Sequence, residues 1–264
     1  MALVMCPLCM GQEDVQLLGE LPDGRLEARC PDCDFTWVHG EARPAPAARA
    51  PLWPVGGLPT AADVDPDLLA RAERLKPVFL AQEHAGLDPH VPAFWTKYGR
   101  LFGEEGLPSA APADLRVFAT DGTGSSLGIQ RTFLDAFDEN PEHGAAQVRQ
   151  VVDYLLRGTG KPLEDRLTGL VRGRLPFSFP GFKEVLLSKV LSVVHPDRFL
   201  TLLTYEQKLI AAKKVYGLDL PPYEEARIGH QIVWSNDLLF GLAGDGFKHA
   251  PHAGEFLWWA QHQT

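Results

Sequence analysis

Two pairs of cysteines near the N-terminus place the strongest constraint on what this chain can fold into. Cys6 and Cys9 form one Cys-x-x-Cys pair, Cys30 and Cys33 form a second, and twenty residues separate the two pairs. A two-residue turn lets both sulfurs of a pair reach one tetrahedral ion, and a hairpin between the pairs brings them together. The spacing therefore predicts a four-cysteine zinc ribbon. Because protein atoms fill all four ligand positions, we expect the zinc to be structural.

The sequence contains four cysteines in all, so this site leaves no thiol for redox chemistry. The first residues lack the basic and apolar regions of a secretory signal. No apolar run reaches the roughly 18 residues that a membrane-spanning helix needs. We therefore expect a cytoplasmic protein without a membrane partner, in whose reducing compartment paired cysteines bind metal rather than form disulfides.

Composition divides the 264 residues into three parts. Residues 1–41 hold two alternating runs around a Pro-Asp-Gly sequence at 22–24, which predicts a β-hairpin because glycine supplies positive φ. Residues 42–60 are rich in proline and alanine and predict a semi-extended linker. Residues 61–264 show the apolar spacing of helices. The expected fold class is mostly α, with an N-terminal four-cysteine β zinc ribbon, a proline-rich linker and a multi-helix C-terminal domain.

Start and stop signals place the expected helices within the C-terminal domain. Asp and Asn before proline favour helix starts, a Thr-x-x-Gln sequence predicts a capping box, and glycines favour helix ends. The expected helices cover about 65–86 with a break or kink at Pro77, 141–158, 181–194, 204–217, 228–240 and 256–258.

Charge is distributed unevenly along a chain whose formal net charge is −9. Residues 157–214 hold eleven basic residues against five acidic ones, whereas the segments on both sides are acidic. Such a window predicts an anion-binding face, because long basic side chains at helix ends and loops reach a phosphate backbone. A solvated surface whose bases pair with acidic neighbours remains the alternative. The candidate DNA contacts are Arg157, Lys161, Arg172, Arg174, Lys183, Lys208, Lys213 and Lys214, and the window also holds Arg166, Lys189 and Arg198.

One arrangement matches the letters of a metal-dependent nuclease signature. Pro196-Asp197 precedes Glu206-x-Lys208, and in PD…ExK nucleases the carboxylates hold magnesium while the lysine orients the attacking water. Those enzymes place these residues on adjacent β-strands. Here Glu206 and Lys208 fall in an expected helix and face different directions, so nuclease chemistry is an alternative rather than the favoured function.

A glycine-rich segment at residues 158–161, Gly-Thr-Gly-Lys, shares part of the phosphate-binding loop of nucleotide-hydrolysing enzymes. That loop requires glycine where this chain has Leu155, and a hydroxyl to ligate magnesium where it has Pro162. We therefore expect no nucleotide as partner or substrate.

Three segments resemble the helical region that precedes the GTPase domain in McrB-type restriction proteins. They are FKEVLLSKVLSVVHPDRFLTLLTYE at 182–206, GEFLWW at 254–259 and, more loosely, ENPEHGAAQVRQVVDYLL at 139–156. The resemblance covers about half of the chain and rests on helical packing residues. This sequence stops where the motor domain would begin. The resemblance therefore implies a recognition or scaffold role in DNA restriction, without GTPase or translocase activity.

The sequence thus favours a DNA-binding or adaptor protein of a restriction or phage-defence system, non-catalytic on its own and joined by a protein partner that would supply catalysis. One alternative is the metal-dependent nuclease with Asp197, Glu206 and Lys208. The other is a protein–protein scaffold whose acidic zinc ribbon docks a basic partner. Salt-dependent DNA binding favours the first function, magnesium-dependent nicking the second, and the absence of both the third.

The first prediction concerns the metal. Elemental analysis of purified protein should find one zinc ion per chain. Cys30→Ser should unfold residues 1–41 while the helical domain stays folded, because metal binding supplies the folding free energy of so small a module and the linker separates the two. Protein without zinc, or a variant whose helical circular dichroism is lost, would contradict the predicted ribbon.

Overall fold

The structure of the protein is a computed structural model that describes residues 16–20, 26–29, 36–39, 57–82, 90–123 and 130–263. The chain divides into two compact units, residues 1–55 and 56–264. The four cysteines, the turn at 22–24 and nearly all of the linker lie outside the described residues. The predicted zinc site and linker therefore stay predictions.

The first unit contains a three-stranded antiparallel sheet in the order β1-β2-β3. Its strands are β1 (Gln16–Glu20), β2 (Leu26–Arg29) and β3 (Thr36–His39). Gln16 pairs with Arg29 and Glu20 with Leu26. The strands β1 and β2 thus run in opposite directions. The first residue of β1 lies beside the last residue of β2.

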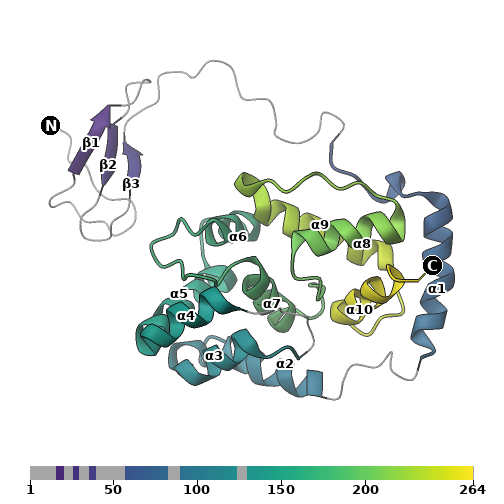
Figure 1. Ribbon diagram of the computed structural model, residues 1–264, viewed down its shortest axis with the longest axis horizontal. Coiled ribbons are helices and arrows are strands. Elements are labelled where there is room, and N and C mark those ends of the chain that lie inside the picture. Colours follow the sequence, from purple (N-terminus) through teal and green to yellow (C-terminus); the bar gives the residue numbers. More distant parts are fainter. Residues whose placement is uncertain are drawn as a thin grey trace. The chain divides into compact units, whose positions relative to one another are not determined.

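The second unit is helical, which confirms the predicted mostly α class (Figure 1). None of the described helices is long and apolar enough to span a bilayer. The helices are η1 (Ala61–Asp63), α1 (Pro66–Leu80), α2 (His90–Leu101), η2 (Leu107–Ser109), α3 (Pro112–Thr120), α4 (Arg131–Glu139), α5 (Pro141–Arg157), α6 (Leu163–Arg172), α7 (Glu184–Val194), α8 (Tyr205–Tyr216), η3 (Glu225–Arg227), α9 (Ile228–Ala243) and α10 (Ala250–Ala260).

Several predicted helix boundaries are confirmed by their capping bonds. The Asp65 carboxylate accepts hydrogen bonds from the first-turn amides of α1, and the Asn140 side chain accepts one at the start of α5. Thr204 and Gln207 form the predicted capping box of α8, which ends at Gly217 in a left-handed conformation. These side chains satisfy amides that have no partner inside the helix, so they fix where each helix begins.

Three predicted boundaries are wrong, one of them the start of the last helix, α10, which begins at Ala250 rather than near 256. Helix α1 continues through Pro77 but ends at Leu80 rather than near Gly86. Pro77 has no amide to bond the preceding turn, which weakens the helix one turn before its end. Helix α7 begins at Glu184 rather than at 181, because Gly181 has a φ of +72°, which an α-helix does not accept.

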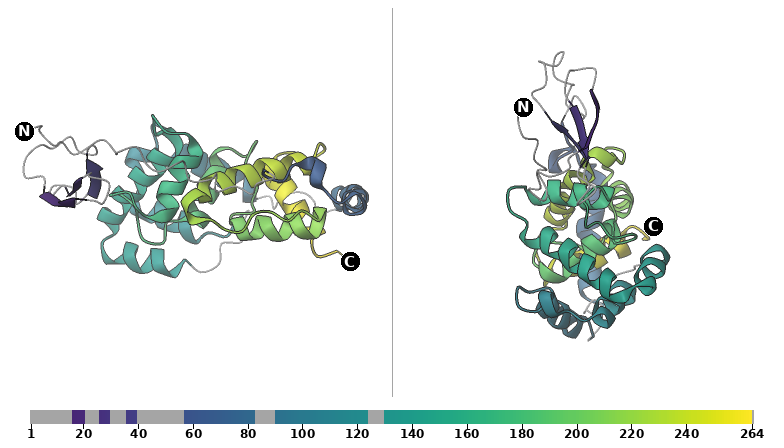
Figure 2. Two further views of the ribbon diagram at one scale, coloured as in Figure 1. Left: turned by 90° about the horizontal axis from the view of Figure 1, so that it is seen from above. Right: turned by 90° about the vertical axis from the view of Figure 1, so that its left-hand side faces the viewer.

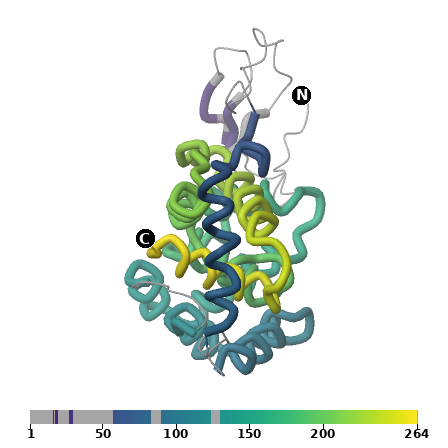
Figure 3. Tube along the Cα trace, turned by 90° about the vertical axis from the view of Figure 1, so that its right-hand side faces the viewer, coloured from purple at the N-terminus to yellow at the C-terminus, as the bar shows by residue number. Residues whose placement is uncertain are grey.

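Helix α7 lies in the middle of the helical unit and contacts α2, α5 and α6 (Figure 1). Its residues 186–193 are all buried. Helix α9 packs against α6, α8 and α10. Helix α1 runs across α8 and α10 (Figure 3), at the end of this unit opposite α4 (Figures 1 and 2).

The buried residues of α7 include a lysine, Lys189, whose side chain is 1% exposed. Its Nζ donates a hydrogen bond of 2.8 Å to the Phe118 carbonyl and another to the Asp121 carbonyl, at the C-terminal end of α3. The same nitrogen lies 4.9 Å and 4.7 Å from the ring centres of Phe94 and Phe118. Lys189 thus joins α7 to α2 and α3 and satisfies carbonyls that α3 leaves without partners. Lys189 is therefore a core residue, although it belongs to the basic window at 157–214.

Burial lowers the pKa of Lys189 to about 7, against the opposing effect of the Asp121 charge. Because this value lies below the ordinary 10.5, the unfolded chain binds more protons than the folded one between about pH 7 and 10. The free energy of unfolding of the wild type should therefore rise with pH in this range relative to that of Lys189→Met, which lacks the amine. Urea unfolding at several pH values measures this difference.

Lys214→Met, at an exposed position of α8, is the control. It should change the free energy of unfolding by no more than about 0.5 kcal/mol at each pH. The quantity to follow is the free energy of unfolding of the wild type minus that of Lys189→Met. If it stays constant or falls as pH rises, Lys189 is not buried in this way.

Candidate nucleic-acid interface

The structure removes Lys208 from the candidate DNA contacts. Its side chain, on α8, is 1% exposed, so its amine cannot reach a phosphate from inside the core. Burial lowers the pKa of Lys208 to about 8, and the charge of Glu184 opposes that shift. Burial in turn raises the pKa of Glu184, whose carboxylate accepts a hydrogen bond from the Tyr205 amide. The expectation that Lys208 contacts DNA is therefore wrong.

The three residues of the nuclease alternative occupy different environments. Glu206 is exposed in the first turn of α8, whereas Lys208 is buried two residues later. Asp197 is exposed in the connector between α7 and α8. In the part of the chain that the structure describes, no three His, Cys, Asp or Glu residues group so as to hold a metal ion.

Two of the remaining candidates are held by acidic side chains or carbonyls. The Arg157 guanidinium lies 2.6 Å from Asp153 and donates to the Phe102 carbonyl at 3.0 Å. Lys213 lies 2.7 Å from Asp219. These bases fit the alternative in which the window is a surface of paired charges. Lys161 and Lys214 are exposed.

Three other candidates lie together where α6 ends and α7 begins. Helix α6 ends at Arg172, Gly173 turns the chain in a left-handed conformation, and Arg174 follows as an exposed residue. Lys183 precedes the first residue of α7. Its Nζ lies 3.6 Å from the point that a Cβ on Gly173 would occupy. We call Arg172, Arg174 and Lys183 the basic corner.

A cleft of about 450 Å³ adjoins the basic corner. Lys183 lines it from just before α7, Glu184 and Val185 from the first turn of α7, and Arg131 and Thr132 from the start of α4. Arg131 lies outside the basic window, so charge distribution along the sequence did not single it out. The sequence offers no spacing rule that would bring Arg131 to Lys183.

Gly181 explains why these two helix starts lie side by side. Its φ is +72°, and a Cβ built on it would lie 2.3 Å from the Phe133 backbone nitrogen in α4. Gly181 lies in the connector between α6 and α7. Only a residue without a side chain lets this connector pass the first turn of α4 so closely. The approach places Lys183 and Arg131 along one cleft.

The cations of the corner differ in how tightly neighbouring acids hold them. Nε of Arg172 lies 3.7 Å from Glu225, and its side chain is 23% exposed. Nε of Arg131 lies 3.8 Å from Asp135, and that side chain is 85% exposed. Arg174 and Lys183 are exposed, and neither has an ion pair within 4.0 Å among the residues that the structure describes. These two cations are therefore the most available to an anion.

Comparison of the chain with protein-family models, with curated proteins and with solved structures finds no match.

The close approach at Gly181 can be tested against a glycine of similar backbone conformation. Gly160 has a φ of +80° and open space where a Cβ would lie, whereas a Cβ on Gly181 would meet the Phe133 backbone. Gly160→Ala should cost about 1–2 kcal/mol through backbone strain alone. Gly181→Ala should cost about 1–3 kcal/mol more, because the backbone must also move. Equal losses in urea unfolding would show that α4 and α7 do not meet at Gly181.

Proposed function

We propose that the protein is a DNA-binding or adaptor protein of the restriction or phage-defence kind, non-catalytic on its own, that contacts the phosphate backbone through its basic corner. The observation that carries the proposal is the convergence of Lys183 with Arg172 and Arg174 at Gly173. Long, exposed cations at a helix end and in a loop are the groups that contact backbone phosphates in protein–DNA complexes.

The charges elsewhere on the protein make this corner the favoured place for a polyanion. The chain has a formal net charge of −9, so its overall charge disfavours a polyanion, and DNA binding needs a local cluster of cations. Arg157 and Lys213 are balanced by acids, and Lys189 and Lys208 are buried. The adjoining cleft adds Arg131 to the cations near the corner, although Glu184 also lines it.

The proposal includes a structural zinc ion held by Cys6, Cys9, Cys30 and Cys33. The register of the first unit supports it, because Gln16 at the start of β1 pairs with Arg29 at the end of β2. The segment before β1 carries one cysteine pair and the segment after β2 carries the other. Both segments thus join the β1–β2 hairpin at the same end, the end away from its turn. Zinc bound there would supply folding free energy that a module of this size lacks.

Of the two alternative functions, the scaffold, whose acidic zinc ribbon would dock a basic partner, needs no DNA-binding surface. Several bases of the window form ion pairs with acids of the protein itself, as expected for a solvated surface. These pairs are Arg157–Asp153, Lys213–Asp219 and Arg198–Asp237. The burial of Lys208 counts against the nuclease, because the lysine of that signature must meet the attacking water.

The salt dependence of DNA affinity tests the proposal. Log affinity should fall with log salt concentration at a slope of about −0.9 per phosphate contact. In Arg174→Ala/Lys183→Ala the slope should become shallower by about two, and affinity should fall for all sequences alike. Fluorescence anisotropy of labelled duplex DNA, plain and modified, at several salt concentrations measures both effects.

The matched control is Arg74→Ala/Lys248→Ala, which removes the same charge from exposed positions of α1 and of the segment before α10. It should leave the salt slope close to that of the wild type. Two outcomes would contradict the proposal: the wild type binds no DNA, or both double variants weaken binding equally. Either result would remove the basic corner as a DNA contact and leave the scaffold as the better account.

A further inference from the structure

One exposed aromatic residue, Tyr223, lies in the connector between α8 and η3. Tyr223 is 52% exposed, and among the described residues one other large aromatic side chain is exposed to a similar degree, that of Trp258 on α10 at 50%. The Trp258 ring lies 5.1 Å from the His262 ring, measured between ring centres. Within the described part of the chain, the Tyr223 ring contacts no other ring. About half of the Tyr223 surface therefore remains for a ligand.

The backbone on both sides of Tyr223 is fixed by helix α9. The side chain of Gln231, which is fully buried, donates a hydrogen bond of 2.8 Å to the Pro222 carbonyl and accepts one of 2.8 Å from the Glu224 amide. Pro222 also has a fixed φ, because its ring closes on the backbone nitrogen. Tyr223 is thus held on a rigid segment, so a ligand that binds its ring need not first order the backbone.

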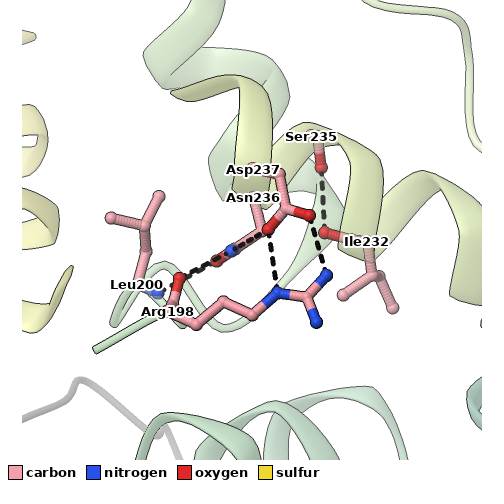
Figure 4. Close-up of polar contacts among 6 residues, drawn as sticks. All are labelled: Arg198, Leu200, Ile232, Ser235, Asn236 and Asp237. Atoms are coloured by element: carbon pink, nitrogen blue, oxygen red, sulfur yellow. Dashed lines mark hydrogen bonds and ion pairs between the residues drawn. The ribbon is translucent and has the colours of Figure 1, made fainter. Parts of the chain in front are cut away.

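A second bridge of this kind occurs farther along α9 (Figure 4). The Asn236 side chain donates to the Arg198 carbonyl at 2.9 Å and accepts from the Leu200 amide at 2.9 Å, so it joins the two residues that flank Phe199. Phe199 is 4% exposed and belongs to the core. The bridge at the start of α9 instead holds Tyr223 in solvent. Tyr223 is therefore exposed on a segment that is bonded as firmly as one in the core.

The segment that carries Tyr223 lies beside the basic corner. Two residues after Tyr223, the Glu225 carboxylate lies 3.7 Å from Nε of Arg172, and η3 packs against α6. Burial raises the pKa of Tyr223, and the charges of Glu184 and Glu225 raise it further. Because such charge effects weaken with distance, the Tyr223 hydroxyl lies near both carboxylates.

Tyr205, at the start of α8, joins the same segment to the start of α7. Its amide donates to the Glu184 carboxylate, and its hydroxyl donates to the Pro221 carbonyl at 2.7 Å. Glu184 directly follows Lys183 in the sequence. Tyr223 therefore lies on a segment that is tied to both sides of the basic corner.

The charges at this place favour a ligand that offers more than phosphates. The three cations of the basic corner lie near two carboxylates, those of Glu184 and Glu225, so the formal local charge is small and positive. Glu225 balances Arg172, which leaves Arg174 and Lys183 for about two phosphates. Phosphate contacts alone therefore give modest affinity. A base stacked on an aromatic ring adds a contribution that needs no charge.

We propose that the basic corner binds single-stranded DNA, with one unpaired base stacked on the Tyr223 ring and the adjacent phosphates on Arg174 and Lys183. This inference rests on the proposed function and specifies the form of the DNA. Cations that follow the backbone, combined with an aromatic ring for a base, are characteristic of proteins that bind single strands. In a duplex, neighbouring base pairs cover both faces of each base, so a duplex reaches the phosphate contacts but not the ring.

Tyr223→Ala tests the stacking directly. Fluorescence anisotropy measures the affinity of the full chain for a labelled thymidine homopolymer, which cannot pair with itself, and for a duplex of equal length. The substitution should weaken binding of the single strand by about 5- to 150-fold, the range for one base on an aromatic side chain, and change duplex affinity by less than about twofold. The loss should be the same at every salt concentration, because stacking releases no counterions. Tyr223→Phe keeps the ring and should bind both forms like the wild type.

Two controls separate stacking from other effects. Trp258→Ala removes a ring of similar exposure from α10 and should leave both affinities unchanged. A single strand with abasic sites throughout offers the phosphates without the bases. The wild type and Tyr223→Ala should bind this strand equally.

The outcomes distinguish this inference from the proposed function. If the wild type binds neither form of DNA, the proposed function fails and this inference fails with it. If the wild type binds DNA through Arg174 and Lys183, three results would overturn the inference alone. Tyr223→Ala would bind the thymidine strand like the wild type, lose affinity equally for the thymidine strand and the duplex, or lose as much affinity for the abasic strand.

Discussion

The hydrogen bonds of the buried Lys189 amine join α7, the helix that precedes one connector and follows another at the candidate sites, to its neighbours α2 and α3. The amine meets the carbonyls of Phe118 and Asp121 at the end of α3 and lies against two aromatic rings. A buried amine needs acceptors, and the carbonyls at a helix end need donors, so each satisfies the other. The contact fixes α7 against α2 and α3, and from there α7 packs against α5 and α6.

The position of α7 then determines which basic groups reach the surface. Its first turn begins after Gly181, which passes the start of α4 so closely that a side chain would not fit. Lys183 is thereby brought to Gly173, where α6 ends. The connector that follows α7 is pinned to α9 by Asn236 and Asp237. One buried helix thus has the basic corner at its start and, at its end, a connector that is fixed to α9.

Part of this arrangement is predictable from the sequence because it depends on local chemistry. Asp65, Asn140 and Thr204 cap helices where the sequence predicts them, since each side chain bonds amides within three residues. The burial of Lys189 and Lys208 was not predictable, because lysine is ordinarily a surface residue and its acceptors lie on other helices. The same holds for Arg131, which a contact between α4 and the connector before α7 brings to the cleft.

Acylation of lysines with and without DNA tests directly the proposal that DNA lies against the basic corner. Mass spectrometry reports how fast each exposed amine reacts. Lys183 lies at the corner, whereas Lys248 is exposed just before α10. Duplex DNA should slow the acylation of Lys183 several-fold and leave Lys248 unchanged, and added salt should restore reactivity as the complex dissociates. Unchanged acylation of Lys183 in a DNA-saturated sample would contradict the account.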